Sequence, residues 1–150
     1  MEKINIKIMQ LDNSQDMILP QYESDGSSGM DIRAAVSEPI ILQPGEIKLI
    51  PTGLAISIPT GFEAQIRPRS GLALKHGIGI VNSPGTIDSD YRGEIGIIMI
   101  NWGLEAFSIN RGDRIAQMVI TRVCHAKIIP VADLDSTKRG KGGFGHSGMN

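Results

Sequence analysis

The sequence is poor in aromatic residues, which make up only 4% of its 150 positions. This scarcity argues against a stacking platform for single-stranded nucleic acid, because such a platform needs a series of exposed rings. The formal net charge is −1, so the chain also lacks the positive excess of a general nucleic-acid or membrane-surface binder. Any phosphate that it binds is therefore expected to be bound locally.

Cysteine is scarce as well, since Cys124 is the only one in the sequence. It cannot form an intramolecular disulfide, which suits a reducing compartment, and we expect it to be a core residue. The longest apolar run, residues 95–100, is far too short to cross a bilayer. Residues 1–8 alternate polar and apolar types without the hydrophobic centre of a signal peptide. We therefore expect a cytoplasmic protein with no membrane partner and no nucleic-acid partner.

Short segments of strand character, separated by glycine and proline, fill most of the sequence. The segments that indicate strands are 4–8, 30–35, 40–42, 47–50, 54–58, 62–66, 78–81, 95–100, 106–109 and 115–123. Pro44-Gly45 is the preferred central pair of a type II turn and predicts that its flanking segments form a hairpin. A late segment, Ile128–Val131, is interrupted by Pro130, so we expect it at a sheet edge.

The length fits one domain, and only residues 70–75 change to a helical period. Ser70 is the expected N-cap of this short helix, and Gly77 is its expected end. Many short strands with almost no helix predict an all-β fold, either a sandwich, a jelly roll or a barrel.

The C-terminal residues 136–150 differ from the rest, because the segment 139–148 within them is basic and five of its ten residues are glycine. Such a segment cannot build a core alone, so we expect a β domain over residues 1–135 and a flexible arm over 136–150. Composition by itself favours a disordered tail. The alternative is a lid, in which Arg139 and Phe144 would close over a charged, flat ligand.

Three polar segments are candidates for a site. Residues 85–94 place Asp88 and Asp90, a tyrosine and an arginine on a loop between what we expect to be two hairpin arms; a charged turn is the alternative. Arginines 67 and 69 precede the short helix, where an anion would be favoured, although Ser70 could serve only as a cap. Residues 111–117, with Gln117, would alone suggest no more than a charged turn. The three histidines are scattered and form no metal cluster with Cys124.

Five segments, in this order, resemble the five motifs of the trimeric dUTP pyrophosphatases (dUTPases). They are SGMDIRAA at 28–35, RPRSGLA at 67–73, GTIDSDYRG at 85–93, RGDRIAQ at 111–117 and RGKGGFG at 139–145. One such motif is weak evidence, whereas five in order over nearly the whole chain are highly specific.

The resemblance implies Mg²⁺-dependent hydrolysis of dUTP to dUMP and pyrophosphate, by attack of water on the α-phosphorus. This reaction keeps uracil out of DNA and supplies dUMP for thymidylate synthesis. It also implies a homotrimer of distorted jelly rolls with shared active sites. In the family, one subunit contributes the first, second and fourth motifs, a second contributes the third, and the arm of another closes over the ligand.

Residue roles follow from the same resemblance. Asp88 would be the base that activates the water, and Asp31 would hold the water shell of Mg²⁺. Tyr91 would lie beneath the deoxyribose and exclude a 2′-hydroxyl, and Phe144 would stack on the uracil. Uracil would be bound around Asn82, Thr86, Ile87 and Gly96. The phosphate ligands would be Arg69, Ser70, Gly71, Gln117 and Arg139, and the closing arm would also contribute Gly145 and Ser147. One departure from the family pattern is His146, which occupies the position of a hydroxyl residue.

Two alternatives remain open from the sequence. A dCTP deaminase shares the expected fold, but its chemistry needs a glutamate on the strand after the loop, where this chain has Ile98-Met99. A non-catalytic nucleotide-binding trimer with a regulatory role is the second alternative.

Overall fold

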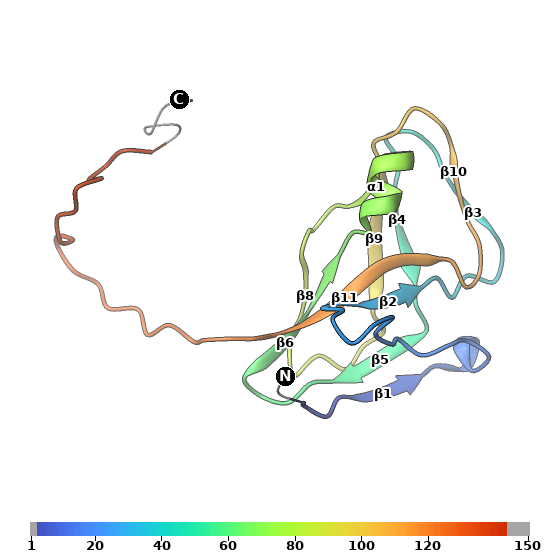
Figure 1. The fold of residues 1–150 in the computed structure, drawn as a ribbon, viewed down its shortest axis with the longest axis horizontal. Coiled ribbons are helices and arrows are strands. Elements are labelled where there is room, and N and C mark those ends of the chain that lie inside the picture. The colour runs from blue at the N-terminus through green and yellow to red at the C-terminus, as the bar shows by residue number, and fades with distance from the viewer. Residues whose placement is uncertain (1–2, 144–150) are drawn as a thin grey trace.

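The computed structural model describes residues 3–143, which form β-strands and one short α-helix (Figure 1). The elements are β1 (Lys7–Gln10), the 3-10 turn η1 (Asp12–Ser14), β2 (Met30–Arg33), β3 (Ile40–Leu42), β4 (Ile47–Pro51), β5 (Leu54–Ser57), β6 (Phe62–Arg67), α1 (Ser70–His76), β7 (Ile78–Ile80), β8 (Gly85–Ile87), β9 (Gly96–Asn101), β10 (Phe107–Ile109) and β11 (Arg114–Arg122). The all-β prediction with one short helix is confirmed. No helix in residues 3–143 is long and apolar enough to cross a bilayer.

The strands form four antiparallel sheets. The largest has the order β2-β11-β6-β8, a second has the order β4-β9-β7, and the pairs β1-β5 and β3-β10 complete the fold. In the largest sheet, Gln117 on β11 lies opposite both Asp31 on β2 and Arg67 on β6. The pairing therefore brings three segments that are distant in sequence to one place.

Alternating side chains on these strands make the core. The burial pattern of β2 and β9 alternates residue by residue, as expected of strands with one face packed inward. Fully buried side chains from different sheets meet in one hydrophobic cluster, among them Ile32, Ile50, Ile97, Met99 and Met118. Burial of this kind stabilises a fold by about 25 cal/mol for each Å² of apolar surface removed from water.

The helix α1 begins one residue away from the expected cap. Arg69, not Ser70, is the N-cap residue, and no side chain caps the helix there, so the prediction for Ser70 was wrong. The first backbone bond runs from the Ala73 amide to the Arg69 carbonyl, which includes Ser70 in the helix. Gly77 ends the helix as expected, in the left-handed conformation (φ 66°) that glycine adopts without a steric cost.

The two predicted hairpins are not formed. The turn at Pro44-Gly45 is present, with the Glu46 amide bonded to the Gln43 carbonyl, but β3 pairs with β10 and β4 pairs with β9. Likewise, β8 pairs with β6, whereas β9 pairs with β4 and β7. Turn residues determine local geometry, whereas packing decides which strands pair. Residues 88–95 therefore connect two different sheets.

The chain after β11 also differs from expectation. Residues 123–143 contain neither helix nor strand and run away from the body of the molecule (Figure 1). The strand predicted at Ile128–Val131 is absent, and these side chains are exposed. No strand within residues 3–143 pairs with this segment, and Pro130 cannot donate a backbone hydrogen bond. Cys124 is exposed in the same segment, so its assignment to the core was wrong.

Candidate active site

A pocket of about 200 Å³ lies where the connection between β8 and β9 leaves the two sheets. Its buried lining is apolar and includes Ile66, Ile80 and Ile97. Six of the residues predicted from the sequence line it: Asn82, Thr86, Ile87, Asp88, Tyr91 and Gly96. The structure thus brings the predicted base and the predicted pyrimidine contacts together in one cavity.

The strand β8 gives this pocket a polar edge. It stands last in the order β2-β11-β6-β8, so on one side its amides and carbonyls have no strand partner within residues 3–143. Such unpaired backbone groups can bond an extended or planar ligand. Asp88 is the first residue after β8, and it is exposed.

The loop between Asp88 and Gly96 is ordered by its own hydrogen bonds. The Tyr91 amide donates to the Asp88 carbonyl (3.2 Å), and the Tyr91 hydroxyl donates to the Glu94 carbonyl (3.0 Å). Arg92 Nη1 donates to the Ser89 and Tyr91 carbonyls, at 2.7 Å each. Any Cβ at Gly93 would overlap the Tyr91 hydroxyl. The Tyr91 side chain therefore packs against Gly93. Tyr91 lines the pocket, and 44% of its surface is exposed.

A second polar group, which we call the arginine cluster, consists of Asp31, Arg69, Arg114 and Gln117. Arg69 Nε lies 3.1 Å from Asp31 Oδ1, and Arg114 Nη1 lies 3.0 Å from Asp31 Oδ2. Arg69 Nη1 also donates to the Arg114 carbonyl (3.0 Å), and Gln117 Nε2 donates to the Pro68 carbonyl (3.0 Å). Arg114 Nη1 also lies 3.9 Å from Glu23 Oε1, so a second carboxylate is near the cluster. The planar guanidinium groups of Arg69 and Arg114 are of the kind that binds phosphate oxygens.

Ser70 and Gly71 lie next to this cluster in sequence, at the start of α1, and both are exposed. A Cβ added at Gly71 would meet nothing within 4 Å, so the fold of this chain does not require glycine there. Because Gly71 has no side chain, a ligand can approach the backbone closely at this position.

The pocket and the arginine cluster are separate in one chain. No member of the cluster lines the pocket, and in the largest sheet β2 and β8 are at opposite edges. Arg139 is exposed, and its Nε donates to the nearby Gly142 carbonyl (2.8 Å). Phe144, Gly145 and Ser147, as well as His146, lie outside the described residues.

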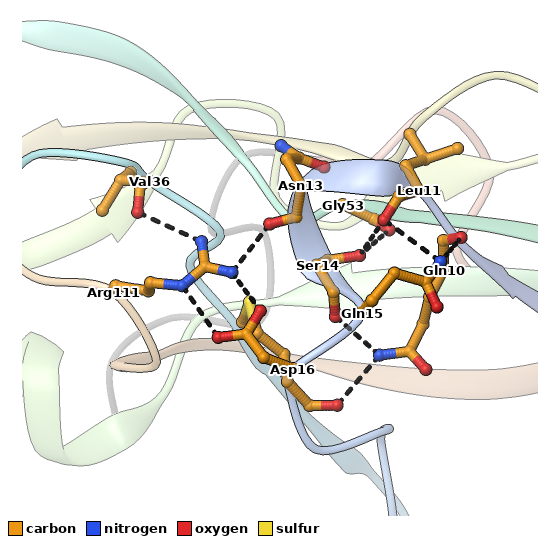
Figure 2. Close-up of polar contacts among 10 residues, drawn as sticks. Gln10, Leu11, Asn13, Ser14, Gln15, Asp16, Val36, Gly53 and Arg111 are labelled. Carbon is orange, nitrogen blue, oxygen red and sulfur yellow. Dashed lines mark hydrogen bonds and ion pairs between the residues drawn. The ribbon is translucent and has the colours of Figure 1, made fainter.

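Arg111, in the fourth motif, has a structural position that the sequence did not suggest (Figure 2). Its guanidinium is directed to the N-terminal turn η1, where Nη2 donates to the Asn13 carbonyl (2.7 Å) and Nε to Asp16 Oδ2 (3.3 Å). Nη1 donates to the Val36 carbonyl (3.3 Å). The hydrogen bond from Arg111 holds the pKa of Asp16 below its ordinary value. No local pattern could have revealed a pair so distant in sequence.

Other residues that we missed lie under the pocket wall or in the arginine cluster. Glu94 lines the pocket and accepts a hydrogen bond from the Gly53 amide (2.7 Å). Thr52, 1% exposed, donates to the Ile95 carbonyl (2.6 Å). Arg114 was read as part of a charged turn but is an ion-pair partner of Asp31. Within the described range, no three His, Cys, Asp or Glu side chains are placed to hold a metal on their own.

Comparison with known proteins identifies relatives along nearly the full length. The family model described as dUTPase matches residues 15–148. A deoxyuridine 5'-triphosphate nucleotidohydrolase of Thermoanaerobacter sp. (strain X514) is 59% identical over 146 residues, which cover 97% of this chain and 99% of the relative. One from Maricaulis maris (strain MCS10) is 56% identical over 151 residues, 99% of each chain.

Solved structures of phage proteins have the same fold. A mutant dUTPase of Staphylococcus bacteriophage 80alpha with dUpNHpp superimposes with a TM-score of 0.86 at 28% identity, covering 97% of this chain and 99% of that one. A mutant dUTPase from phage phi11 of S. aureus, described with a structural Mg(II) ion, superimposes with a TM-score of 0.79 at 26% identity, covering 89% and 100%.

Proposed function

Because the chain belongs to the dUTPase family, we propose that it is a dUTP diphosphatase, which hydrolyses dUTP to dUMP and pyrophosphate. Its task is to keep uracil out of DNA and to supply dUMP for thymidylate synthesis. The observation that carries the proposal is the pocket in which Asp88, Tyr91 and the free side of β8 meet. A volume of about 200 Å³ suits a base with its sugar and leaves the triphosphate outside.

Uracil binds between β8 and β9, near Thr86, Ile87 and Gly96, with Asn82 at the rim. Backbone amides and carbonyls have fixed directions, so they distinguish a uracil edge from a cytosine edge by donor and acceptor pattern. A mismatch that leaves buried polar groups unpaired discriminates far more strongly than the loss of one methyl contact. Tyr91 lies under the deoxyribose and excludes a ribose 2′-hydroxyl.

Asp88 orients and deprotonates the water that attacks the α-phosphorus in line with the leaving pyrophosphate. Its position at the pocket and its exposure to solvent support this role. Arg69, Ser70, Gly71 and Gln117 hold the phosphates. Positioning and charge neutralisation are most of what phosphoryl transfer requires from a protein.

A homotrimer joins the two groups of site residues. The pocket and the arginine cluster are separate in one chain, which is the arrangement expected if each active site takes one group from each of two subunits. An apolar face supports assembly: Ile47 and Leu49 on β4 are 53% and 66% exposed, and they lie opposite Ile100 and Ile98 on β9. Cross-strand partners share one face of a sheet, and large exposed apolar faces mark protein interfaces.

Mg²⁺ is the expected cofactor, and Asp31 fits it as an outer ligand. A carboxylate has about four acceptor sites, and each Asp31 oxygen here accepts one bond from an arginine. Both oxygens can therefore still accept from water bound to a metal. Mg²⁺ held mainly through phosphates needs only one or two carboxylates, and when bound it would neutralise charge on the triphosphate.

The arm over residues 136–150 is proposed to close over the bound nucleotide. Arg139 would reach the terminal phosphate, Phe144 would stack on uracil, and Gly145 and Ser147 would complete the closure. The place of action is proposed to be the cytoplasm. The exposed and unpaired thiol of Cys124 is in keeping with a reducing compartment.

A substrate comparison tests the function. The purified full chain is incubated with dUTP, UTP, dTTP and dCTP in separate reactions with Mg²⁺, and nucleotide products, pyrophosphate and ammonia are measured. The proposal expects dUMP and pyrophosphate in equal amounts, from dUTP far above the other nucleotides. Ammonia from dCTP would indicate a deaminase, although the strand that would need a glutamate has Ile98 and the fully buried Met99. Binding of dUTP without turnover would indicate a regulatory protein.

A further inference from the structure

The wall of the pocket between Tyr91 and Gly96 is joined to the turn between β4 and β5. The Ile95 amide donates to the Leu54 carbonyl (2.8 Å), and the Ile95 carbonyl accepts from the Thr52 hydroxyl (2.6 Å). The Thr52 hydroxyl also accepts from the Leu54 amide (3.3 Å), so the buried side chain is bonded on both sides. Ile95 is thus fixed through the buried core.

Glu94 is fixed in a different way, through its side chain. Its Oε1 accepts from the Gly53 amide at 2.7 Å, while its backbone carbonyl accepts from the Tyr91 hydroxyl at 3.0 Å. One residue therefore connects the tyrosine of the pocket to the body of the protein. Hydrogen bonds to an ionised carboxylate are roughly twice as strong as bonds between neutral groups.

Gly53 is itself held from the opposite side by the N-terminal turn (Figure 2). Its carbonyl accepts from the Ser14 hydroxyl (2.6 Å) and from the Leu11 amide (2.8 Å). Its φ of 66° favours glycine, and a Cβ at this position would overlap Ser14. Because two hydrogen bonds hold the Gly53 carbonyl, the Glu94 carboxylate is bonded to an anchored partner.

We propose that Glu94 is a positioning residue for sugar discrimination, because its carboxylate fixes the carbonyl that holds the Tyr91 hydroxyl. The inference rests on the proposed function, in which Tyr91 excludes the 2′-hydroxyl of a ribonucleotide. Without the carboxylate, the peptide unit of Glu94 keeps the bond from the Ile95 amide to the Leu54 carbonyl but loses the bond to Gly53. With one of these two anchors gone, the carbonyl that holds the Tyr91 hydroxyl is fixed less firmly, and the ring can move away from a 2′-hydroxyl. Asp88 directly follows Ile87, which is paired with Ala64 in the sheet, so we expect Asp88 to shift less than Tyr91.

The exposed position of Glu94 makes the test feasible, since its replacement leaves no buried group in an apolar core. Three variants are compared with the wild type: Glu94→Ala, which removes the acceptor; Glu94→Gln, which keeps an oxygen acceptor at the same length; and Glu38→Ala, in which another exposed glutamate outside the pocket is removed. Thermal unfolding confirms that each variant is folded.

The decisive readout is the ratio of kcat/KM for dUTP to kcat/KM for UTP. We expect Glu94→Ala to lower this ratio by about tenfold, mainly through KM, because a site that fits the sugar loosely rejects the extra hydroxyl less well. Glu94→Gln should stay within about threefold of the wild type, since the neutral acceptor bonds more weakly but in the same place. Glu38→Ala should leave the ratio unchanged.

A double variant tests whether Glu94 acts through the Tyr91 hydroxyl. Tyr91→Phe removes the hydroxyl that Glu94 holds, so Glu94→Ala combined with Tyr91→Phe should lower the ratio no further than the more damaging single variant. Independent, additive losses would overturn the inference. So would a wild-type ratio in Glu94→Ala, or equal losses in the Ala and Gln variants.

The same comparison by equilibrium binding separates this inference from the proposed function. Imido-bridged analogues of dUTP and UTP, which are not cleaved, are titrated into each protein. A lower preference for the deoxy analogue in Glu94→Ala supports the inference even if the wild type hydrolyses nothing, a result that would reject only the proposed function. Unchanged preference in that variant rejects the inference even if the wild type is a fast dUTPase.

Discussion

Arg69 Nε lies 3.1 Å from Asp31 Oδ1, so the predicted phosphate ligand and the predicted metal residue are partners in one ion pair. Arg114 occupies the other oxygen of the same carboxylate at 3.0 Å. The Asp31 side chain is only 17% exposed, and its place on β2 is set by the register that puts Gln117 opposite. The carboxylate therefore orients two cations and still has acceptor capacity for metal-bound water.

Asp31→Asn should weaken the affinity of the active site for magnesium. The variant keeps the shape but loses the charge that attracts hydrated Mg²⁺, and changes to outer ligands typically cost about 10- to 100-fold in metal affinity. We expect the Mg²⁺ concentration for half-maximal dUTP hydrolysis to rise about tenfold. The exposed loop residue Asp25 gives the control, Asp25→Asn. An unchanged Mg²⁺ requirement in Asp31→Asn would remove Asp31 from the metal site.

Subunit mixing tests the shared active site. Asp88→Asn removes the base from one group of site residues, and Arg69→Ala removes a phosphate ligand from the other, so each variant alone should have little activity. If every site combines two subunits, a mixed trimer has one complete site, and refolding an equal mixture should restore about a quarter of the wild-type activity. No recovery, with mixed trimers verified by mass, would mean that both groups act from the same chain.

Truncation tests the proposed arm. Deletion of residues 138–150 should lower the rate of dUTP hydrolysis by far more than it changes the assembly state, because the last strand within residues 3–143 ends at Arg122. Light scattering gives the mass of the assembly, and steady-state kinetics give the rate. A truncated protein with wild-type kinetics would contradict the lid.

The pair of Asp16 and Arg111 predicts an acid dependence of stability. The hydrogen bond from Arg111 lowers the pKa of Asp16 from 3.8. The stability that such a group contributes is fully present above pH 3.8, the ordinary pKa. It is lost as the pH falls through the lower pKa of the folded state. The melting temperature of the wild type should exceed that of Asp16→Asn by a small, constant amount above about pH 5. This difference in melting temperature should become smaller in more acidic buffer. A difference that becomes larger in acidic buffer would contradict the ion pair.

Local patterns predicted most of the strands. The alternation at Phe62–Ile66 and the glycine stop at Gly77 are near-neighbour properties, and both are found where expected. Pairing partners were predicted less well, because Pro44-Gly45 determines only its own turn while β4 finds its partner in β9. Cys124 looked like a core residue by type, but the chain leaves the body of the protein after β11.

The sequence named candidate site residues but not how they lie relative to one another. The resemblance pointed to Asp88, Tyr91 and the contacts around β8, and these residues do share a pocket. The functions of Glu94 and Arg111 as hydrogen-bonding partners of distant backbone groups depend on the tertiary fold. No spacing in the sequence indicates that Glu94 meets Gly53, or that Arg111 meets Asn13 and Asp16.

The most direct test of the account is the hydrolysis rate of Asp88→Asn, measured by pyrophosphate release at saturating dUTP and Mg²⁺ beside its affinity for the imido-bridged dUTP analogue. The asparagine keeps the size of the side chain but cannot accept a proton from water. The account predicts that kcat falls by about 10²- to 10⁴-fold while the affinity for the analogue stays within a few-fold. A variant that hydrolyses dUTP at the wild-type rate would contradict the assignment of Asp88 as the catalytic base.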